Sequence, residues 1–316
     1  MAGLRTAQMP PAVFAPILGL LGLGLAWRRA SAVWGVPDAM GELILGASAG
    51  LWLFAAVSYG LKVWQRPGVL AEDAAALPGR AGLAAAGLGG LALALGLVPY
   101  APVLARGLLL LTLAWQAGFA VLVLRLIFGG PPEGRRVTPV WLLTFVGFIL
   151  GPLVAAPLGW SGLAVLLLAL MLPVAAAIHL VSLRQLWQET PIPPLRPLLV
   201  IHLAPISLGG LGLGALGIDW AAALLALLAS GLALALLASL RWITAAGFTP
   251  FWGAFTFPVA AYANLLGLMA GLYPWVQVAA LPVLALATVA VPWIAIRILR
   301  LWAGGRLGEM TGAARA

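Results

Sequence analysis

Phe251–Asn264 reads FWGAFTFPVAAYAN and stands near the start of an apolar run long enough to cross a membrane. Pro258 lies inside this run, where a proline removes a helix hydrogen bond and kinks the helix. Bulky rings precede the proline at Phe255 and Phe257, and small residues follow it, with one tyrosine and one asparagine among them. A kinked membrane helix with a ring and a few isolated polar groups fits the wall of a narrow pathway. It also fits a core helix that packs its rings against neighbours.

The composition around this stretch is that of an integral membrane protein. Of 316 residues, 64% are hydrophobic and 8% are charged, and the mean hydropathy is +1.11. Soluble domains carry about 25% charged residues, so this chain lacks the charges that cover a water-facing surface. Apolar runs of about 20 residues recur along it, which indicates helical spans rather than the alternating segments of a β-barrel. The chain has no cysteine, which excludes disulfides and cysteine-ligated clusters.

The apolar runs predict a single transmembrane domain, 1–316, with ten helices separated by loops rich in proline, glycine and charge. Spans three and four, five and six, and nine and ten are joined by very short connections, so each of these pairs is expected to form a helical hairpin. The expected spans are 12–27, 41–64, 81–98, 103–128, 139–158, 161–183, 198–216, 220–242, 250–272 and 275–301.

The basic residues give the chain a formal net charge of +9. They are scattered between the apolar runs, so they indicate membrane topology rather than a nucleic-acid partner. With the N-terminus in the cytoplasm, every basic residue except Arg28, Arg29 and Arg106 falls on the cytoplasmic side, where lysine and arginine are enriched. We therefore expect a multi-pass protein of the cell inner (plasma) membrane, in contact with membrane lipids, with both termini in the cytoplasm.

The odd-numbered spans begin at similar intervals, and Thr138–Trp141 echoes Thr249–Trp252 at two of these starts. Chance similarity in so biased a composition is the alternative to a true repeat. Prolines or glycines in every odd span support the repeat, because such helices are tolerated where neighbours or a water-filled cavity satisfy the freed backbone groups. The pattern predicts five quasi-repeated hairpins around a central pore, with odd helices inside and even helices outside. The prolines of the odd spans are Pro16, Pro152, Pro205 and Pro258.

No catalytic or metal-binding set stands out, so neither an enzyme nor a cofactor is expected. His179 and His202 are the only histidines, and no carboxylate accompanies either at ligand spacing. His179 stands near a cytoplasmic span end and is expected at the interface. His202 precedes Pro205 by about one helical turn and is expected to pack in the core, with a pore-facing position as the alternative.

All eight carboxylates fall in loops or at span ends, and no basic residue lies in the middle of a span. Ionisable residues inside a membrane typically mark proton relays and ion coupling, so their absence argues against a coupled pump. A passive pore would instead offer hydroxyls, amides and ring edges, and one without negative lining favours anions. For each polar candidate, pairing with a neighbouring helix is the alternative. The candidates are Thr144, Ser207, Thr256, Tyr262 and Asn264.

Three stretches carry a family resemblance. Pro10–Leu20 (PPAVFAPILGL), in a span that closes with Leu25–Trp27, resembles the first span of bacterial TehA proteins. Leu203–Pro205 resembles the seventh-span motif of that family, and Phe251–Asn264 is similar to its ninth span. The resemblance is to the tellurite-resistance/dicarboxylate transporter family, which includes the slow anion channels of plant guard cells. Each motif is short, but their order covers essentially the whole chain.

The resemblance implies a homotrimer in which each protomer has its own pore, lined by the five odd helices and occluded midway by a phenylalanine. Phe257 matches that gate. Two departures from the family pattern stand out. The first kink falls one place early, at Pro16, and span three has no proline, which leaves its pore-facing residues unassigned. The expected pore-lining residues are Phe14, Pro16, Thr144, Pro152, His202, Pro205, Ser207, Phe255, Thr256, Pro258, Tyr262 and Asn264.

The leading functional interpretation is a passive anion channel or channel-like exporter, with small anions such as chloride, nitrate, carboxylates or tellurite-like oxyanions as substrates. A first alternative is a proton-coupled carrier of dicarboxylates, or an exporter of tellurite or organic cations. A second is a membrane enzyme or structural subunit that uses His179 and His202. Dependence of flux on a proton gradient would separate the first alternative from a channel, and bound metal or haem would favour the second.

Overall fold

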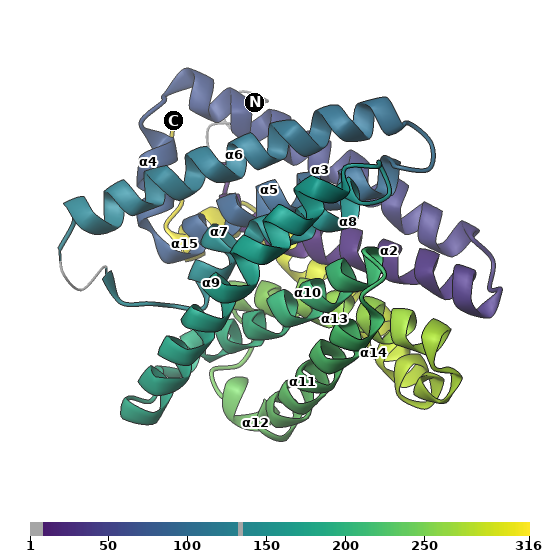
Figure 1. The fold of residues 1–316 in the computed structure, drawn as a ribbon. Coiled ribbons are helices and arrows are strands. Elements are labelled where there is room, and N and C mark those ends of the chain that lie inside the picture. Colours follow the sequence, from purple (N-terminus) through teal and green to yellow (C-terminus); the bar gives the residue numbers. More distant parts are fainter. Residues whose placement is uncertain (1–8, 132–134) are drawn as a thin grey trace.

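The computed structural model describes residues 9–131 and 135–316 of the chain, which is drawn in Figure 1. The regular elements of this part are helices, and it contains no strand. Nine of the helices are long and apolar enough to cross a membrane. The all-helical membrane fold predicted from composition is therefore confirmed for the residues that the structure describes.

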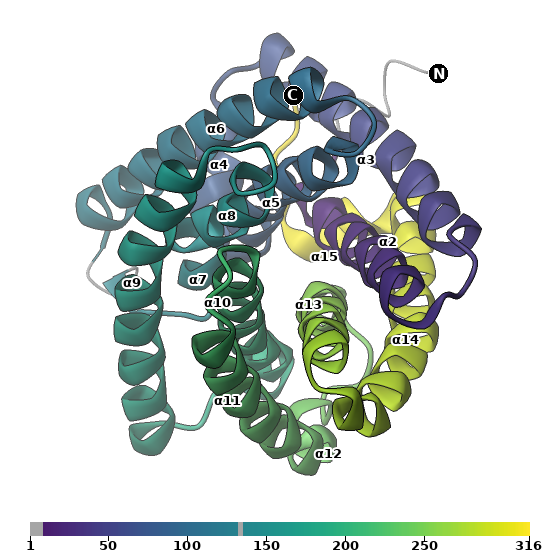
Figure 2. The same ribbon diagram turned by 45° about the vertical axis from the view of Figure 1, so that its right-hand side comes forward.

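Four of the spanning helices stand at the centre of the bundle (Figure 2). Three of them begin with a 3-10 helix, which continues directly into the α-helix within the same span. They are α2 (Phe14–Trp34, after η1, Pro11–Val13), α5 (Leu77–Leu97), α10 (Leu203–Ala215, after η4, Pro193–His202) and α13 (Gly253–Leu272, after η5, Pro250–Trp252).

Five further helices surround the central ones, and each packs against the inner segment that it follows along the chain (Figure 2). Of the most apolar 18 residues of each spanning helix, 67–72% are buried in the four inner helices and 17–33% in the five outer ones. The outer helices are α3 (Ala39–Gln65), α6 (Pro102–Gly129), α9 (Ser161–Gln188), α11 (Asp219–Ala238) and α14 (Gln277–Ala303, after η6, Pro274–Val276).

The fifth expected span, 139–158, is an interrupted helix. It consists of α7 (Val140–Phe145), η3 (Gly147–Leu150) and α8 (Gly151–Ala155). Glycine weakens a helix, and the proline at the second position of α8 has no N–H to donate to the preceding turn. This segment is not among the nine long helices, so a total of ten spans stays a prediction. It nevertheless completes the inner ring, because it packs between α5 and α10.

Gln116 of α6 donates hydrogen bonds to two backbone carbonyls at this interruption. Its Nε2 donates to the carbonyl oxygens of Leu143 and Thr144, each at 2.8 Å. A buried carbonyl without a partner is costly in a membrane, so a side-chain amide at this position stabilises the broken helix. Gly147 is required for the approach, because a Cβ there would lie 2.7 Å from Gln116 Nε2.

The prolines of the inner segments do not all kink a helix, which corrects the sequence-based expectation. Pro258 lies inside α13. Pro16, Pro152 and Pro205 lie in the first turn of α2, α8 and α10, respectively. The N–H groups of a first turn have no partner within the helix, so a proline there removes no hydrogen bond. These three prolines therefore mark where 3-10 segments pass into α-helices.

Residues near both ends of the chain meet at one end of the bundle, which we call the terminal end. Lys62 Nζ donates to Met9 O (3.0 Å) and to Asp73 Oδ2 (2.8 Å), and the Ala314 backbone N donates to Asp73 Oδ1 (2.7 Å). Tyr59 also donates to Asp73 Oδ2, at 2.9 Å. These contacts join α3 to a short helix outside the spans, α4 (Val69–Ala75), and to the residues that follow a second short helix, α15 (Arg306–Thr311). The opposite end of the bundle is called the far end.

Candidate functional site

A cavity of about 310 Å³ lies among the inner segments toward the far end, and we call it the vestibule. All five inner segments line it, mostly with leucine and other apolar side chains. Its lining residues are Gly22, Leu25, Arg28, Arg29, Ala32, Leu95, Val98, Pro99, Leu150, Leu153, Pro157, Leu208, Leu211, Phe257, Ala261 and Asn264.

A second cavity, of about 50 Å³, lies among the starts of the same five segments, and we call it the terminal cavity. Two residues of α15, Met310 and Thr311, also line it. The short C-terminal helix therefore lies across the terminal end of the bundle. The other lining residues are Ala12, Ala15, Pro78, Ala81, Gly82, Leu143, Leu198, Ile201, Pro250, Phe251, Gly253 and Ala254.

The two cavities lie at different depths of one axis. In every inner segment, the residues that line the terminal cavity precede those that line the vestibule. In α2, for example, Ala15 lines the terminal cavity and Gly22 lines the vestibule. In α13 the change falls between Ala254 and Phe257. Phe257 is therefore the first side chain of α13 on the vestibule, on the side nearer the terminal cavity.

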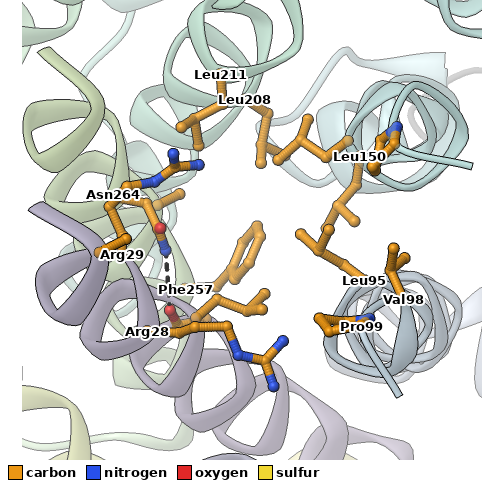
Figure 3. Close-up of a pocket in the computed structure, with 16 residues that line it drawn as sticks. Arg28, Arg29, Leu95, Val98, Pro99, Leu150, Leu208, Leu211, Phe257 and Asn264 are labelled. Atoms are coloured by element: carbon orange, nitrogen blue, oxygen red, sulfur yellow. Dashed lines mark hydrogen bonds between the residues drawn. The ribbon is translucent and has the colours of Figure 1, made fainter. Parts of the chain in front are cut away.

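The Phe257 ring points into the space between the inner segments (Figure 3). Only 5% of the residue is exposed. The ring rests against α2 at Gly22, where a Cβ would lie 3.0 Å from Phe257 Cδ2. One turn earlier, a Cβ at Gly19 would overlap the Thr256 side chain. Two glycines of α2 thus let α13 approach closely enough to place the ring over the axis.

Two polar side chains of α13 contact α2 in this position. Thr256 Oγ1 donates to Gly253 O at 2.7 Å within α13 and also lies 3.1 Å from Ala15 O of α2. Asn264 Nδ2 donates to Gly22 O of α2 at 3.1 Å (Figure 3). Thr256 and Asn264 therefore both reach α2, one on each side of the ring.

The charged lining of the vestibule is positive. Arg28 and Arg29 line it, and no carboxylate lines either axial cavity in the part of the chain that the structure describes. Arg28 is paired with Glu42 of α3, with Nε–Oε1 at 2.8 Å and Nη2–Oε2 at 2.9 Å. Arg29 has no hydrogen-bond or ion-pair partner among residues 9–131 and 135–316. Among the described residues, the two cavities are thus lined by no negatively charged side chain.

A protein-family model described as a voltage-dependent anion channel matches residues 8–299. The chain belongs to this anion-channel family. The match spans all five inner segments, and it confirms the resemblance seen in the sequence. Small anions are the substrates that the family implies, and its members are channels or transporters rather than enzymes. A comparison with curated proteins found no match.

Of the residues expected to line the pore of this family member, Phe257 and Asn264 line the vestibule. The other expected residues are outside the linings of both axial cavities among the described residues. Thr144 and Ser207 are buried, and their hydroxyls donate to the carbonyls four residues earlier, Val140 O (3.3 Å) and Leu203 O (2.8 Å). Tyr262 donates to Ser230 Oγ of α11 at 2.8 Å. For these three, pairing within or between helices is what the structure shows.

The expected aromatic residues other than Phe257 face away from the axis. Phe14 lies edge-on to Tyr59, with ring centroids 6.4 Å apart, and lines a separate apolar cavity between α3, α5 and α6. Phe255 packs against Trp252 with ring centroids 5.4 Å apart. The buried prolines Pro16, Pro152, Pro205 and Pro258 line neither axial cavity among the described residues.

The two histidines, expected apart on different spans, are brought together. Their ring centroids are 4.7 Å apart. His179 Nε2 lies 3.0 Å from His202 O, and His179 Nδ1 lies 2.6 Å from Ala175 O. His202 is buried, and its Nδ1 has no partner in the described part of the chain. Both ring nitrogens of His179 therefore lie close to carbonyl oxygens, and no group of three metal-ligating side chains forms among the residues described.

One pair of ionisable side chains, from a span end and from the loop that follows it, is buried. Lys62 and Asp73 are both 0% exposed and form an ion pair of 2.8 Å. Asp73 belongs to the polar loop, as expected, but that loop folds into α4 and packs against the bundle. Hydropathy along the sequence does not report this, because the burial comes from the chain termini and from α5 packing over the loop.

Most of the vestibule lining is not predicted by the sequence, including Arg29 and Gly22. The expected end of the first span at residue 27 places Arg29 in the following loop, but α2 continues to Trp34 and carries Arg29 into the bundle. The signal was present in the sequence, since apolar residues resume after the arginine pair and the first glycine of the loop is Gly35. Gly35 ends the helix with a left-handed φ of 67°, a position where glycine is preferred.

Proposed function

We propose that this family member is a passive anion channel whose path joins the terminal cavity to the vestibule and is closed by the Phe257 ring. The observation that carries the proposal is the position of this ring, between two cavities that the same five segments line in succession. Neither cavity has an acidic lining residue among those described. Chloride, nitrate, small carboxylates and tellurite-like oxyanions are the candidate substrates.

A phenylalanine ring suits the role of a closed gate. It fills the constriction sterically, and its apolar surface excludes the water that a passing anion would need. Its placement depends on Gly22 and on the hydrogen bond from Asn264, so the closed state is held by packing between α2 and α13. Opening would require the ring to change rotamer or the two helices to separate.

The charge distribution supports an orientation. We propose that the terminal end faces the cytoplasm, because most basic residues lie in loops on that side. The vestibule would then open to the outside of the inner (plasma) membrane. Accessibility of single introduced cysteines to a membrane-impermeant thiol reagent would test this directly, since the chain has no native cysteine.

The assembly that the family resemblance implies is a homotrimer with one path in each protomer. The outer helices expose many large apolar side chains, which suit lipid as well as a neighbouring protomer. We propose the trimer on the resemblance, and the mass of the purified protein after subtraction of bound detergent would measure it.

A coupled carrier is the second candidate, and the buried Lys62–Asp73 pair is the observation that favours it. Buried ionisable residues in membrane proteins commonly serve proton relays. The pair lies outside the linings of both axial cavities, however, and its atoms are engaged with Tyr59, Met9 O and Ala314 N. A structural role at the terminal end therefore accounts for it, and the passive channel remains the function that the geometry supports best.

Replacing the ring tests the channel. In planar bilayers, Phe257→Ala should conduct anions constitutively, with reversal potentials in asymmetric salt that follow the anion gradient, while the parent chain should be nearly silent. Phe255→Ala is the matched control, because it removes the same ring two residues away, where the ring packs on Trp252. Silence of a folded Phe257→Ala, or uptake that needs a proton gradient, would favour the carrier instead.

A further inference from the structure

Two adjacent arginines of α2 have different surroundings. Arg28 is fully engaged: its guanidinium binds the Glu42 carboxylate through two nitrogens and donates from Nη1 to Gly96 O at 2.9 Å. Arg29 lines the same vestibule without any hydrogen-bond or ion-pair partner in the described part of the chain. The one guanidinium is neutralised by its neighbours, and the other leaves its donors and its charge available.

The position of Arg29 is built into the packing of α2 against α13. The side-chain stem lies over Gly267, where a Cβ would be 2.9 Å from Arg29 Cγ. The guanidinium turns into the vestibule beside Asn264 (Figure 3). The amide of Asn264 is itself fixed by its bond to Gly22 O. A long flexible side chain is thus directed toward the same space as the Phe257 ring.

A half-buried guanidinium among leucines is costly when no opposite charge compensates it. An anion in the vestibule would supply that charge. The guanidinium fork matches two coplanar oxygens better than it matches a spherical ion. The remaining lining is largely apolar (Leu25, Leu95, Leu150, Leu153, Leu208 and Leu211), which disfavours strongly hydrated ions.

We infer that Arg29 is the principal donor of an anion-binding site in the vestibule, and that this site prefers a planar oxyanion, such as nitrate or a small carboxylate, to a halide. The inference deepens the proposed channel function, since the site lies directly on the far-end side of Phe257. An anion bound there would lie next to the Phe257 ring while the path is closed.

Binding to the purified, detergent-solubilised parent protein tests the site without any current. The chlorine NMR line of dissolved chloride should broaden with the protein present, and nitrate should reverse this at a lower concentration than bromide. Arg29→Gln should weaken binding by about tenfold or more, as loss of a charge-assisted hydrogen bond does. Arg29→Lys should keep chloride binding and lose the preference for nitrate.

Arg106→Gln is the matched control, because it removes an exposed arginine at the start of α6 that does not line the vestibule. It should bind as the parent does. Undiminished binding in Arg29→Gln, or a preference for nitrate that survives in Arg29→Lys, would overturn the inference. If Arg29→Gln does not fold, the comparison of the parent with Arg29→Lys still decides the preference.

The same substitutions in the Phe257→Ala background separate this inference from the channel itself. Arg29→Gln should reduce the nitrate-to-chloride permeability ratio and lower conductance at low salt, where a fixed charge matters most. Unchanged conduction and selectivity would contradict the Arg29 site and support the channel. Silence of Phe257→Ala together with Arg29-dependent binding would contradict the channel and support the site.

Discussion

The inner and outer helices are built for different neighbours. The outer helices are on average longer and more apolar, yet only a minority of their residues are buried, whereas the inner helices are mostly buried. In water this order would be reversed. In a membrane, lipid accepts the large apolar side chains, and helix contacts instead require small residues that let backbones approach. The more apolar surface therefore faces outward, and the glycine-rich surfaces face neighbouring helices.

Glycines show the contrast most directly. A Cβ at Gly19 or Gly22 of α2 would run into α13. A Cβ at Gly46 of α3 or Gly107 of α6 would meet nothing within 4 Å. The same residue is thus a packing requirement in the inner ring and a neutral position in the outer one. Substitutions in matched pairs can break or sharpen this comparison.

The largest effect on the free energy of unfolding is expected for the two adjacent carboxylates of α4. This helix lies outside the inner ring, yet one of its carboxylates is buried. Asp73→Asn leaves Lys62 buried without its counter-charge, and loss of one partner of a buried pair costs about 3–5 kcal/mol. Glu72→Gln is the control. Glu72 pairs with the exposed Arg66, whose hydrogen bonds lower the pKa of Glu72. Unfolding in SDS, followed by tryptophan fluorescence, should show a large loss of stability for Asp73→Asn and little change for Glu72→Gln. Equal losses of stability would contradict the difference in burial between the two carboxylates.

The next largest effect on stability is expected for a pair of leucines on neighbouring helices. Leu91 of α5 is 0% exposed and Leu111 of α6 is 67% exposed. Leu91→Ala opens a cavity and should lower the free energy of unfolding by about 2–5 kcal/mol. Leu111→Ala should change it far less, because lipid fills the vacated space. The same SDS titration measures both. A similar loss for the two variants would contradict the division into an inner and an outer ring, or place Leu111 in a contact between protomers.

The smallest effect on stability is expected for a pair of glycines, one in α2 and one in α3. Gly19→Ala forces a methyl group against Thr256, and overpacking of this kind costs about 1–3 kcal/mol. Gly46→Ala adds a methyl group in open space and should be neutral or stabilising by up to about 1 kcal/mol, because alanine is the better helix former. The shift in the thermal unfolding midpoint of each variant from that of the parent, measured in detergent, tests this prediction. A Gly19→Ala chain as stable as the parent would show that α2 and α13 separate easily.

Several features were predictable because they depend on local sequence. Composition excludes a water-facing surface, and runs of apolar residues become helices because a membrane leaves no other partner for the backbone. The inner position of the odd segments follows from their prolines and glycines. Phe257 is singled out by the family resemblance of Phe251–Asn264, a short contiguous motif. In each of these cases the deciding residues are neighbours along the chain.

Other features depend on residues far apart in sequence. The interruption of the fifth segment is stabilised by Gln116, a residue of the preceding helix. Thr144, Ser207 and Tyr262 look like pore-lining groups in the sequence but find partners on their own or neighbouring helices. A polar residue in a membrane helix must bond somewhere, and the sequence does not reveal whether a carbonyl, a side chain or water lies within reach.

The sequence alone therefore determined the class and the apolar spans, since hydropathy and helix-breaking residues act locally, and its resemblance to a family supplied the candidate gate. Tertiary structure alone decided that the Phe257 ring stands between two cavities, that Lys62 and Asp73 are buried together, and that of two adjacent arginines one is paired and the other faces the vestibule without a partner among the described residues. The physical reason is that burial and charge compensation are properties of the space around a side chain. That space is enclosed by segments that the chain brings together only on folding.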